Sequence, residues 1–168
     1  MDGEVEEECH VLYVPKDRCR YMSVELEHIR VIVTIGMQIN LDLNLEDGIM
    51  KLTTLPETQD RSDLLRCANF IKAIIMGFSI PVARKLLHRD DLRIDSLNIN
   101  ITGMVVGNTK SQHMYNNLRR TKYAIEQVTR TSLLMNKDRN TIYILGCSSC
   151  IKKAKDYLYH LISLYQIK

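Results

Sequence analysis

The chain has 168 residues, of which 45% are hydrophobic and 26% charged, so it can bury a core and should form one globular domain or two small ones. The net charge of +3 hides an asymmetry, because residues 104–168 carry 11 Lys or Arg against 3 Asp or Glu, whereas residues 1–103 carry 12 against 17, and a polyanion would be drawn to the C-terminal part. The absence of a long apolar run excludes a membrane span, and the acidic N-terminus excludes a secretory or mitochondrial signal, so we expect no membrane partner and a cytosolic or nuclear protein.

The first part of the chain gives mixed local signals. Residues 1–9 are acidic and predict a disordered tail, and residues 10–14 predict an edge strand that ends at Pro15. Ser23 could cap a helix, but the β-branched residues between 29 and 35 favour a strand. Local sequence therefore leaves the segment after Ser23 open.

The elements that follow are clearer. Residues 39–45 alternate strictly between apolar and polar, which predicts a strand with one buried face. Asp47-Gly48 is a hairpin turn signal, and residues 49–54 form the returning strand. Apolar residues at helical spacing predict a helix over 64–78, and Pro81 suits the first turn of a short helix through Leu87.

The second half repeats a similar order of elements. Residues 92–106 are largely extended, and residues 110–115 could form one or two helical turns. A basic loop and a helix follow over 116–131, then a hairpin over 132–145 and a final helix that begins at Ser148 or Ser149. We therefore predict two copies of a small α+β unit, over residues 10–87 and 88–168.

A basic stretch between the predicted short helix and the hairpin is the main functional signal. It contains Arg119, Arg120, Lys122 and Arg130. Cations on a loop beside a helix N-terminus suit phosphate binding, because the side chains and the free backbone N–H groups point the same way. The alternative is a solvated helix face with an accidental basic cluster.

The predicted order of the second unit, β-α-α-β-β-α, is the arrangement of type I KH domains, in which a GXXG loop between two helices clamps the nucleic-acid backbone. Residues 116–119, which occupy the place of this loop, read Asn-Asn-Leu-Arg and contain no glycine. Side chains could still bind phosphate there, but a close approach of phosphate to the backbone would be lost.

Several motifs resemble those of the partner-of-Nob family (also called Dim-two), the KH-containing assembly factors of the small ribosomal subunit. Residues 125–131 read Ile-Glu-Gln-Val-Thr-Arg-Thr, where the family has Ile-Glu-Asn-Val-Thr-Arg-Thr. Thr121-Lys122 also matches, although the family's preceding glycines are missing. Residues 68–78 resemble the family's Ala-Asp-Phe-Val-Lys-Ala-Phe-Ile-Leu-Gly-Phe, and 144–146 match its Ile-Leu-Gly.

The resemblance covers residues 12–165 and implies an α+β fold of two tandem KH-like units, with a helix over residues 23–35 in a first unit that lacks a GXXG loop. Because residues 116–119 contain no glycine, we expect both units to lack this loop. It implies an RNA-binding factor of ribosome biogenesis in the nucleus and nucleolus that reaches the cytoplasm on pre-ribosomal particles. Such a factor would bind the 3′ region of pre-small-subunit rRNA and dock the PIN-domain endonuclease and other assembly factors. It would catalyse no reaction itself and would need no cofactor. The residues that we expect to contact RNA are Lys110, Asn116, Asn117, Arg119, Arg120, Lys122 and Arg130.

Two other hypotheses remain. The chain could be a protein-docking scaffold of the pre-ribosome that has lost most of its RNA binding. The sequence Cys147-Ser148-Ser149-Cys150 could indicate a thiol oxidoreductase, because thiols at a helix start ionise readily, but a tight strand-to-helix turn explains the same residues. Neither the five cysteines nor Asp90-Asp91 has the ligand spacing of a metal site, and no histidine has a partner that would make it catalytic.

Overall fold

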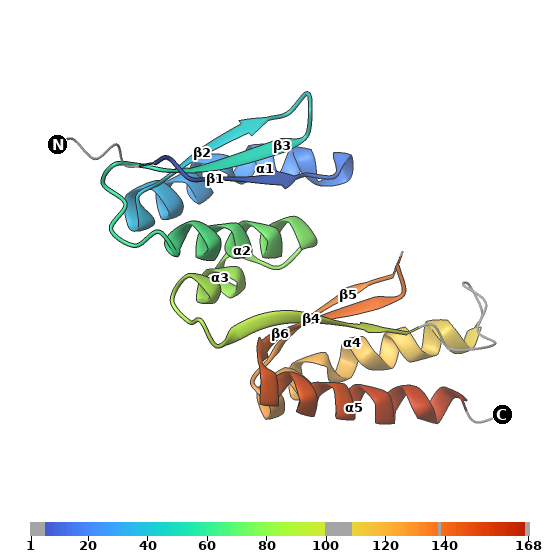
Figure 1. The fold of residues 1–168 in the computed structure, drawn as a ribbon. Coiled ribbons are helices and arrows are strands. Elements are labelled where there is room, and N and C mark those ends of the chain that lie inside the picture. Colours follow the sequence, from blue (N-terminus) through green and yellow to red (C-terminus); the bar gives the residue numbers. More distant parts are fainter. Residues whose placement is uncertain (1–5, 100–108, 138, 167–168) are drawn as a thin grey trace. The chain divides into compact units, whose positions relative to one another are not determined.

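The computed structural model describes residues 6–99, 109–137 and 139–166. The chain divides into two compact units, residues 1–90 and residues 91–168 (Figure 1), and each is described by itself. None of the helices within these described ranges is long and apolar enough to cross a membrane.

The first unit packs helices on one face of a three-stranded antiparallel sheet in the order β1-β3-β2 (Figure 1). Leu12, Leu41 and Leu52 point from the three strands into the core, where they meet residues of the helices such as Phe70, which is fully buried. The elements in chain order are β1 (Cys9–Tyr13), α1 (Lys16–Arg30), the π-helical turn η1 (Val31–Ile35), β2 (Ile39–Asn44), β3 (Ile49–Thr54), α2 (Asp63–Met76), α3 (Ile80–Ala83) and the 3₁₀ turn η2 (Arg84–Leu87).

The second unit has the same strand order, because β4-β6-β5 again places the third strand of the unit between the first and the second. Two long helices cover one face of this sheet (Figure 1). Ile142 and Ile144 of the central strand are fully buried against Leu118 and Leu158 of these helices. The elements are β4 (Leu92–Asn98), α4 (Thr109–Thr129), β5 (Ser132–Asn136), β6 (Thr141–Cys147) and α5 (Ser148–Gln166).

In the first unit, one prediction is wrong and one open question is answered. Helix α1 begins at Lys16, directly after Pro15, and not near Ser23. Residues 29–35 continue this helix instead of forming a strand, because Ile29 and Val33 lie four apart on one helical face and are both fully buried. Burial of that face outweighs the preference of its β-branched residues for a strand. The helix implied by the family resemblance is confirmed.

The predicted acidic tail also ends earlier than expected. Cys9 belongs to β1, and the backbone N–H of Glu8 donates to Thr54 Oγ1 at 2.9 Å. The Glu8 carboxylate pairs with Arg61 at 2.6 Å, so the prediction of disorder is wrong for residues 6–9. Residues 1–5 and the predicted extended stretch 100–106 lie outside the described residues.

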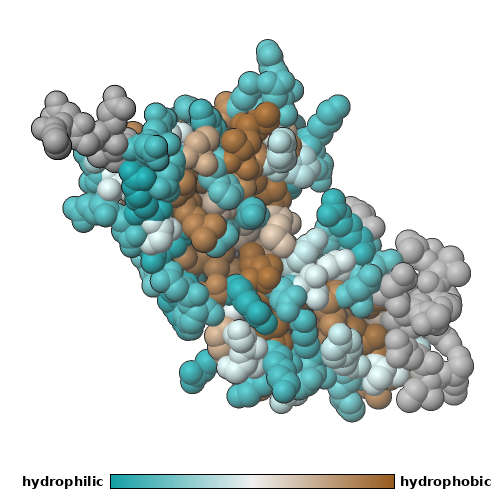
Figure 2. Space-filling model, viewed as in Figure 1, coloured by the Kyte–Doolittle hydropathy of each residue, from teal (hydrophilic) through white to brown (hydrophobic). Residues whose placement is uncertain are grey.

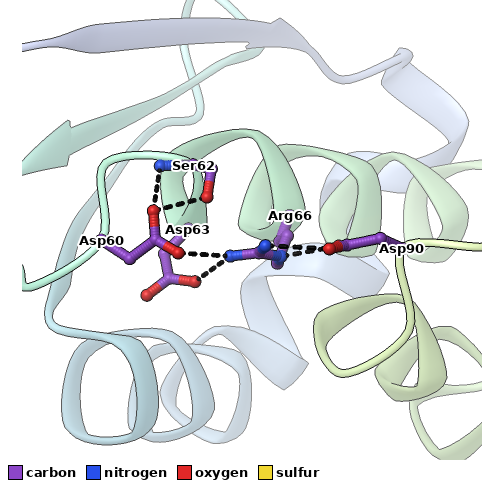
Figure 3. A network of polar contacts seen from close by, with 5 residues as sticks. All are labelled: Asp60, Ser62, Asp63, Arg66 and Asp90. Carbon is purple, nitrogen blue, oxygen red and sulfur yellow. Dashed lines mark hydrogen bonds and ion pairs between the residues drawn. The ribbon is translucent and has the colours of Figure 1, made fainter.

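A network of charged groups ties the end of the first unit to helix α2 (Figure 3). The guanidinium of Arg66 donates two hydrogen bonds to Asp90, at 2.7 and 3.0 Å, and also bonds Asp63 at 2.7 Å and Asp60 at 3.1 Å. Bidentate pairing of this kind fixes both direction and distance. Asp60 in turn accepts the backbone N–H and the hydroxyl of Ser62, so the loop before α2, the helix and residue 90 are held together.

A shallow groove lies between edge strand β1 and helix α2. Its lining is mainly apolar and includes Val11, Leu12, Ile75 and Met76 beside Lys72. Figure 2 shows hydrophobic residues at the surface over the region where β1 and α2 lie in Figure 1.

The Arg66 network predicts an acid-sensitive contribution to stability. Arg66 lowers the pKa of Asp90, and the bonds from Ser62 and Arg66 lower that of Asp60. This stabilisation is therefore present above the ordinary carboxyl pKa of 3.8 and is lost as the pH falls through the lower folded-state values. In urea unfolding between about pH 5 and about pH 2.5, Arg66→Gln should lose less stability on acidification than the wild type. The exposed Arg20→Gln should keep the wild-type profile, and equal slopes for all three proteins would contradict the role of Arg66.

The geometry of the β2–β3 turn predicts that alanine is tolerated less well at Gly48 than at Gly36. Gly48 has a φ of +65°, and a Cβ there would lie 2.8 Å from the carbonyl oxygen of Val14. Gly48→Ala should lower the free energy of unfolding by about 1–2 kcal/mol or more. Gly36 is the matched control, because its φ is −75° and no atom lies within 4 Å of an added Cβ. Thermal unfolding of both variants measures the difference, and Gly36→Ala should be neutral or slightly stabilising. An equal loss of stability in the two variants would show that the turn geometry is not the cause.

Candidate nucleic-acid interface

Helix α4 is one uninterrupted helix of 21 residues. Residues 116–119 lie inside it, so the predicted loop at this place and the separate short helix before it are both wrong (Figure 1). The reason is that residues 109–129 contain neither glycine nor proline, so no residue in this stretch interrupts the helix. The second unit is thus β-α-β-β-α rather than β-α-α-β-β-α.

A buried stripe along α4 runs through the predicted loop. Met114, Leu118, Ile125 and Thr129 are 2–6% exposed. Their spacing of four, seven and four residues places them on one face of the helix. Leu118 is part of the core cluster that includes Ile142 and Ile144 of the central strand. This spacing is readable in the sequence, and it would have predicted a continuous helix where we expected a loop.

Continuity of the helix changes what the backbone can bind. In an α-helix each interior N–H donates to the carbonyl four residues earlier, so the N–H groups of residues 116–119 are already used. A GXXG loop offers its backbone to phosphate, but this segment can offer only side chains. Any phosphate contact at α4 must therefore come from the cations and amides that the helix displays.

The structure brings some of the predicted RNA-contacting residues together. Asn116, Arg119 and Arg120 are exposed, and Arg119 and Lys122 follow Tyr115 by four and seven residues, which places them on the same side of the helix as Tyr115. Tyr123 is 72% exposed and follows Arg119 by four residues. Two arginines, a lysine and an aromatic ring are therefore displayed over about two turns of one helix.

The other predicted residues are placed differently. The amide of Asn117 donates to the hydroxyl of Tyr165 in α5, so this side chain joins the two helices. Arg130 is exposed just beyond the end of α4, about 16 Å along the helix axis from Arg119 by the helical rise. Lys110 lies in the first turn of α4, and the structure describes only its backbone.

The β5–β6 turn adds a cation that the sequence analysis missed. The hydroxyl of Tyr115 donates to Asn140 Oδ1 at 2.8 Å, and Lys137 Nζ lies 5.6 Å from the centre of the Tyr115 ring. Burial raises the pKa of Tyr115, so its phenol remains a neutral donor at neutral pH. The turn is thereby held against the side of α4 that carries Arg119 and Lys122. We call Arg119, Arg120, Lys122 and Lys137 the basic face.

The one acidic residue in this part of α4 is engaged by the sheet. The Glu126 carboxylate accepts the backbone N–H of Leu133 at 3.0 Å, which fixes edge strand β5 beside the helix. Within the described part of the chain, none of the four cations of the basic face forms an ion pair. Their charge remains available to an anionic ligand. The same described residues contain no cluster of three side chains that could hold a metal ion.

Comparisons with known proteins fit this fold. No family model matches the chain. The RNA-binding protein pno1 of Dictyostelium discoideum is 28% identical over 165 residues, which are 96% of this chain and 68% of the relative. The pre-rRNA-processing protein PNO1 of Candida albicans is 30% identical over 129 residues, which are 75% of this chain and 46% of the relative. The chain is thus similar to proteins named PNO1 over most of its length. It spans about two thirds of the slime-mould relative and less than half of the yeast relative.

A crystal structure from Pyrococcus horikoshii, of a complex of a/eIF2alpha, aDim2p and rRNA, contains a chain with the same fold. It has a TM-score of 0.74 at 20% sequence identity, over 95% of this chain and 87% of that one. Dim2p from the same organism, solved separately, has a TM-score of 0.72 at 21% identity. The resemblance to the partner-of-Nob family and the prediction of two tandem KH-like α+β units are confirmed, apart from the helix–loop–helix expected in the second unit.

Helix continuity can be tested by placing glycines at the spacing of the missing loop. Asn116→Gly with Arg119→Gly should lower the stability of the second unit by about 1 kcal/mol, because glycine is a poor residue in a helix interior. Arg139→Gly, in the β5–β6 turn, is the control and should have a much smaller effect. Urea unfolding combined with amide exchange across α4 measures both. A neutral or stabilising double substitution would instead indicate that residues 116–119 form a loop in solution.

Proposed function

We propose that this chain binds pre-rRNA of the small ribosomal subunit and acts as a ribosome biogenesis factor without catalytic activity of its own. The observation that carries the proposal is the basic face, a set of exposed or half-exposed cations on α4 and the adjoining turn. The relatives named RNA-binding or pre-rRNA-processing proteins, and the similar Dim2p chain in a complex with rRNA, support the same ligand class.

Binding would occur through side chains rather than through the backbone. Arg119, Arg120 and Lys122 neutralise phosphates, with Lys137 extending the surface from the turn. Tyr123 offers a ring on which a base can stack, because it is 72% exposed. Tyr115 does not serve this purpose, since it is only 8% exposed and its ring lies beneath Lys137.

The finer parts of the proposal follow the family. The RNA would be the 3′ region of pre-small-subunit rRNA, and the protein would dock the PIN-domain endonuclease for the final 3′ cleavage together with other assembly factors. It would act in the nucleus and nucleolus and pass to the cytoplasm on pre-ribosomal particles. Lys110, Asn116 and Arg130 would extend the contacts along the RNA beyond the basic face.

The second candidate function is a docking scaffold with little RNA binding of its own. One observation favours it, namely that a continuous α4 removes the backbone clamp of a KH loop. The basic face favours RNA binding instead, because a pure scaffold gives no reason for four cations without carboxylate partners among the described residues.

Charge reversal separates these two functions. Arg119→Glu/Arg120→Glu/Lys122→Glu should weaken binding to a single-stranded RNA from the 3′ end of the small-subunit pre-rRNA by about tenfold or more. It should also reduce the slope of log affinity against log salt concentration by about two, since each lost contact contributes about 0.7. Fluorescence anisotropy over a series of salt concentrations measures both quantities.

The control is Lys16→Glu/Arg20→Glu/Lys51→Glu, which changes the net charge equally through exposed residues of the first unit. This variant should retain most of the affinity, with only a small general loss. Equal losses in the two triple variants would show a nonspecific charge effect. Unchanged RNA binding in the α4 variant, with its fold verified by circular dichroism, would reject the basic face and favour the scaffold.

A further inference from the structure

Two thiols meet where the central strand of the second unit joins its last helix. Strand β6 ends at Cys147, and Cys150 lies in the first turn of α5. The two Sγ atoms are 2.8 Å apart, and both cysteines are free and partly exposed. A tight strand-to-helix turn would explain the C-x-x-C sequence, but such a turn does not require the two sulfurs to touch.

Close packing holds the two thiols in this position. Gly146 is buried directly before them, and a Cβ at this residue would lie 2.9 Å from Thr131 Cγ2 and 3.6 Å from Cys150 Cβ. Thr131 therefore packs closely against the end of β6, and Cys150 in the first turn of α5 lies at van der Waals distance from it. Because the strand is central in its sheet and the helix has 19 residues, neither partner can easily move away.

The environment makes the two thiols chemically unequal. Hydrogen bonds from the Cys150 thiol, the Ser149 hydroxyl and the Cys150 backbone N–H lower the pKa of Cys147 to about 7. The hydrogen bond with Cys147 raises the pKa of Cys150. Cys147 is thus the more readily ionised of the two thiols at neutral pH, and Cys150 the less. This is the division between an attacking and a resolving thiol.

We propose that Cys147 and Cys150 form a reversible dithiol–disulfide site that reacts with low-molecular-weight disulfides such as glutathione disulfide. The Cys147 thiolate attacks one sulfur of the small disulfide, whose S–S bond breaks and releases one thiolate that takes up a proton. The Cys150 thiol then loses its proton to solvent and attacks Cys147 Sγ, which releases the second small thiol. The protein loses two electrons and two protons, and the small disulfide gains them. This site does not depend on the RNA-binding proposal.

The remaining cysteines provide internal comparisons. Cys67 is fully buried, and burial raises its pKa to about 12, so it should not react in the folded protein. Cys9 is exposed on edge strand β1 and serves as the reference for an accessible single thiol. Selective reaction at Cys147 therefore cannot be explained by exposure alone.

The test is to equilibrate the full chain in glutathione buffers of increasing disulfide content, block the free thiols and map the modified cysteines by mass spectrometry. The Cys147–Cys150 disulfide should form while Cys67 stays reduced. Cys150→Ser should stop at a mixed disulfide between Cys147 and glutathione, and Cys147→Ser should form neither product at this site.

The rate of alkylation provides a second readout. Cys147 should react roughly fivefold faster at pH 7 than a thiol of ordinary pKa, because its larger thiolate fraction outweighs the lower nucleophilicity of that thiolate. The midpoint of its pH–rate profile should lie near 7 and move upward in Cys150→Ser, which removes the main hydrogen-bond donor. A pair that stays reduced in the most oxidising buffer, or a Cys147 profile that does not change in Cys150→Ser, would overturn the proposal.

Discussion

The uninterrupted hydrogen bonding of helix α4 determines what the second unit can do. A stretch of 21 residues without glycine or proline forms one helix, and a buried stripe through Leu118 fixes it on the sheet. Its interior N–H groups are then paired within the helix, so recognition of an anion passes to side chains. Side-chain cations on flexible stems neutralise phosphate without fixing its position as closely as backbone donors do. The backbone of α4 therefore leaves only side-chain charge for the RNA binding that we propose.

Polar contacts along the helix complete its position. Near its C-terminal end, Thr129 Oγ1 donates to the carbonyl of Ile125 at 2.6 Å and lies 2.8 Å from the hydroxyl of Thr131, with both threonines buried. Arg130 between them has a φ of +55°, a conformation that commonly follows the last turn of a helix. At the other end of the helix, Tyr115 holds the β5–β6 turn through Asn140. The part of α4 that carries the basic face is therefore anchored by polar contacts on both sides.

The sequence predicted elements where local pattern and burial agree. The strict alternation of residues 39–45 predicted strand β2, and the apolar spacing over residues 64–78 predicted helix α2, which ends at Met76 before Gly77 with its φ of +123°. Where the two signals differ, local sequence left a segment open or misled. The β-branched residues between 29 and 35 are helical because their burial, which includes packing against strand β2, outweighs propensity. The loop at 116–119 was predicted by analogy with the KH order of elements, although the apolar spacing on either side of it indicated a helix.

The candidate site was predictable only in part, for a related reason. Arg119, Arg120 and Lys122 are neighbours in sequence and stay together on the helix, but Lys137 joins them through its contact with Tyr115, which no local pattern reveals. Asn117 was predicted as a contact from its place in the supposed loop, and the packing of α4 against α5 directs it to Tyr165 instead.

The two units use the same strand order but manage charge in opposite ways. In the first unit the carboxylates outnumber the cations, and cations such as Arg61 and Arg66 are held by Glu8, Asp60, Asp63 and Asp90. In the second unit the cations are in excess. Asp95 pairs with Lys155 of α5, and the carboxylate of Glu126, which follows Lys122 by four residues on α4, accepts the backbone N–H of Leu133. An ion pair satisfies a cation within the protein, so its field outside is weak, whereas an unpaired cation keeps its attraction for phosphate. The second unit can therefore attract a polyanion while the first unit repels it, although both are built on one topology.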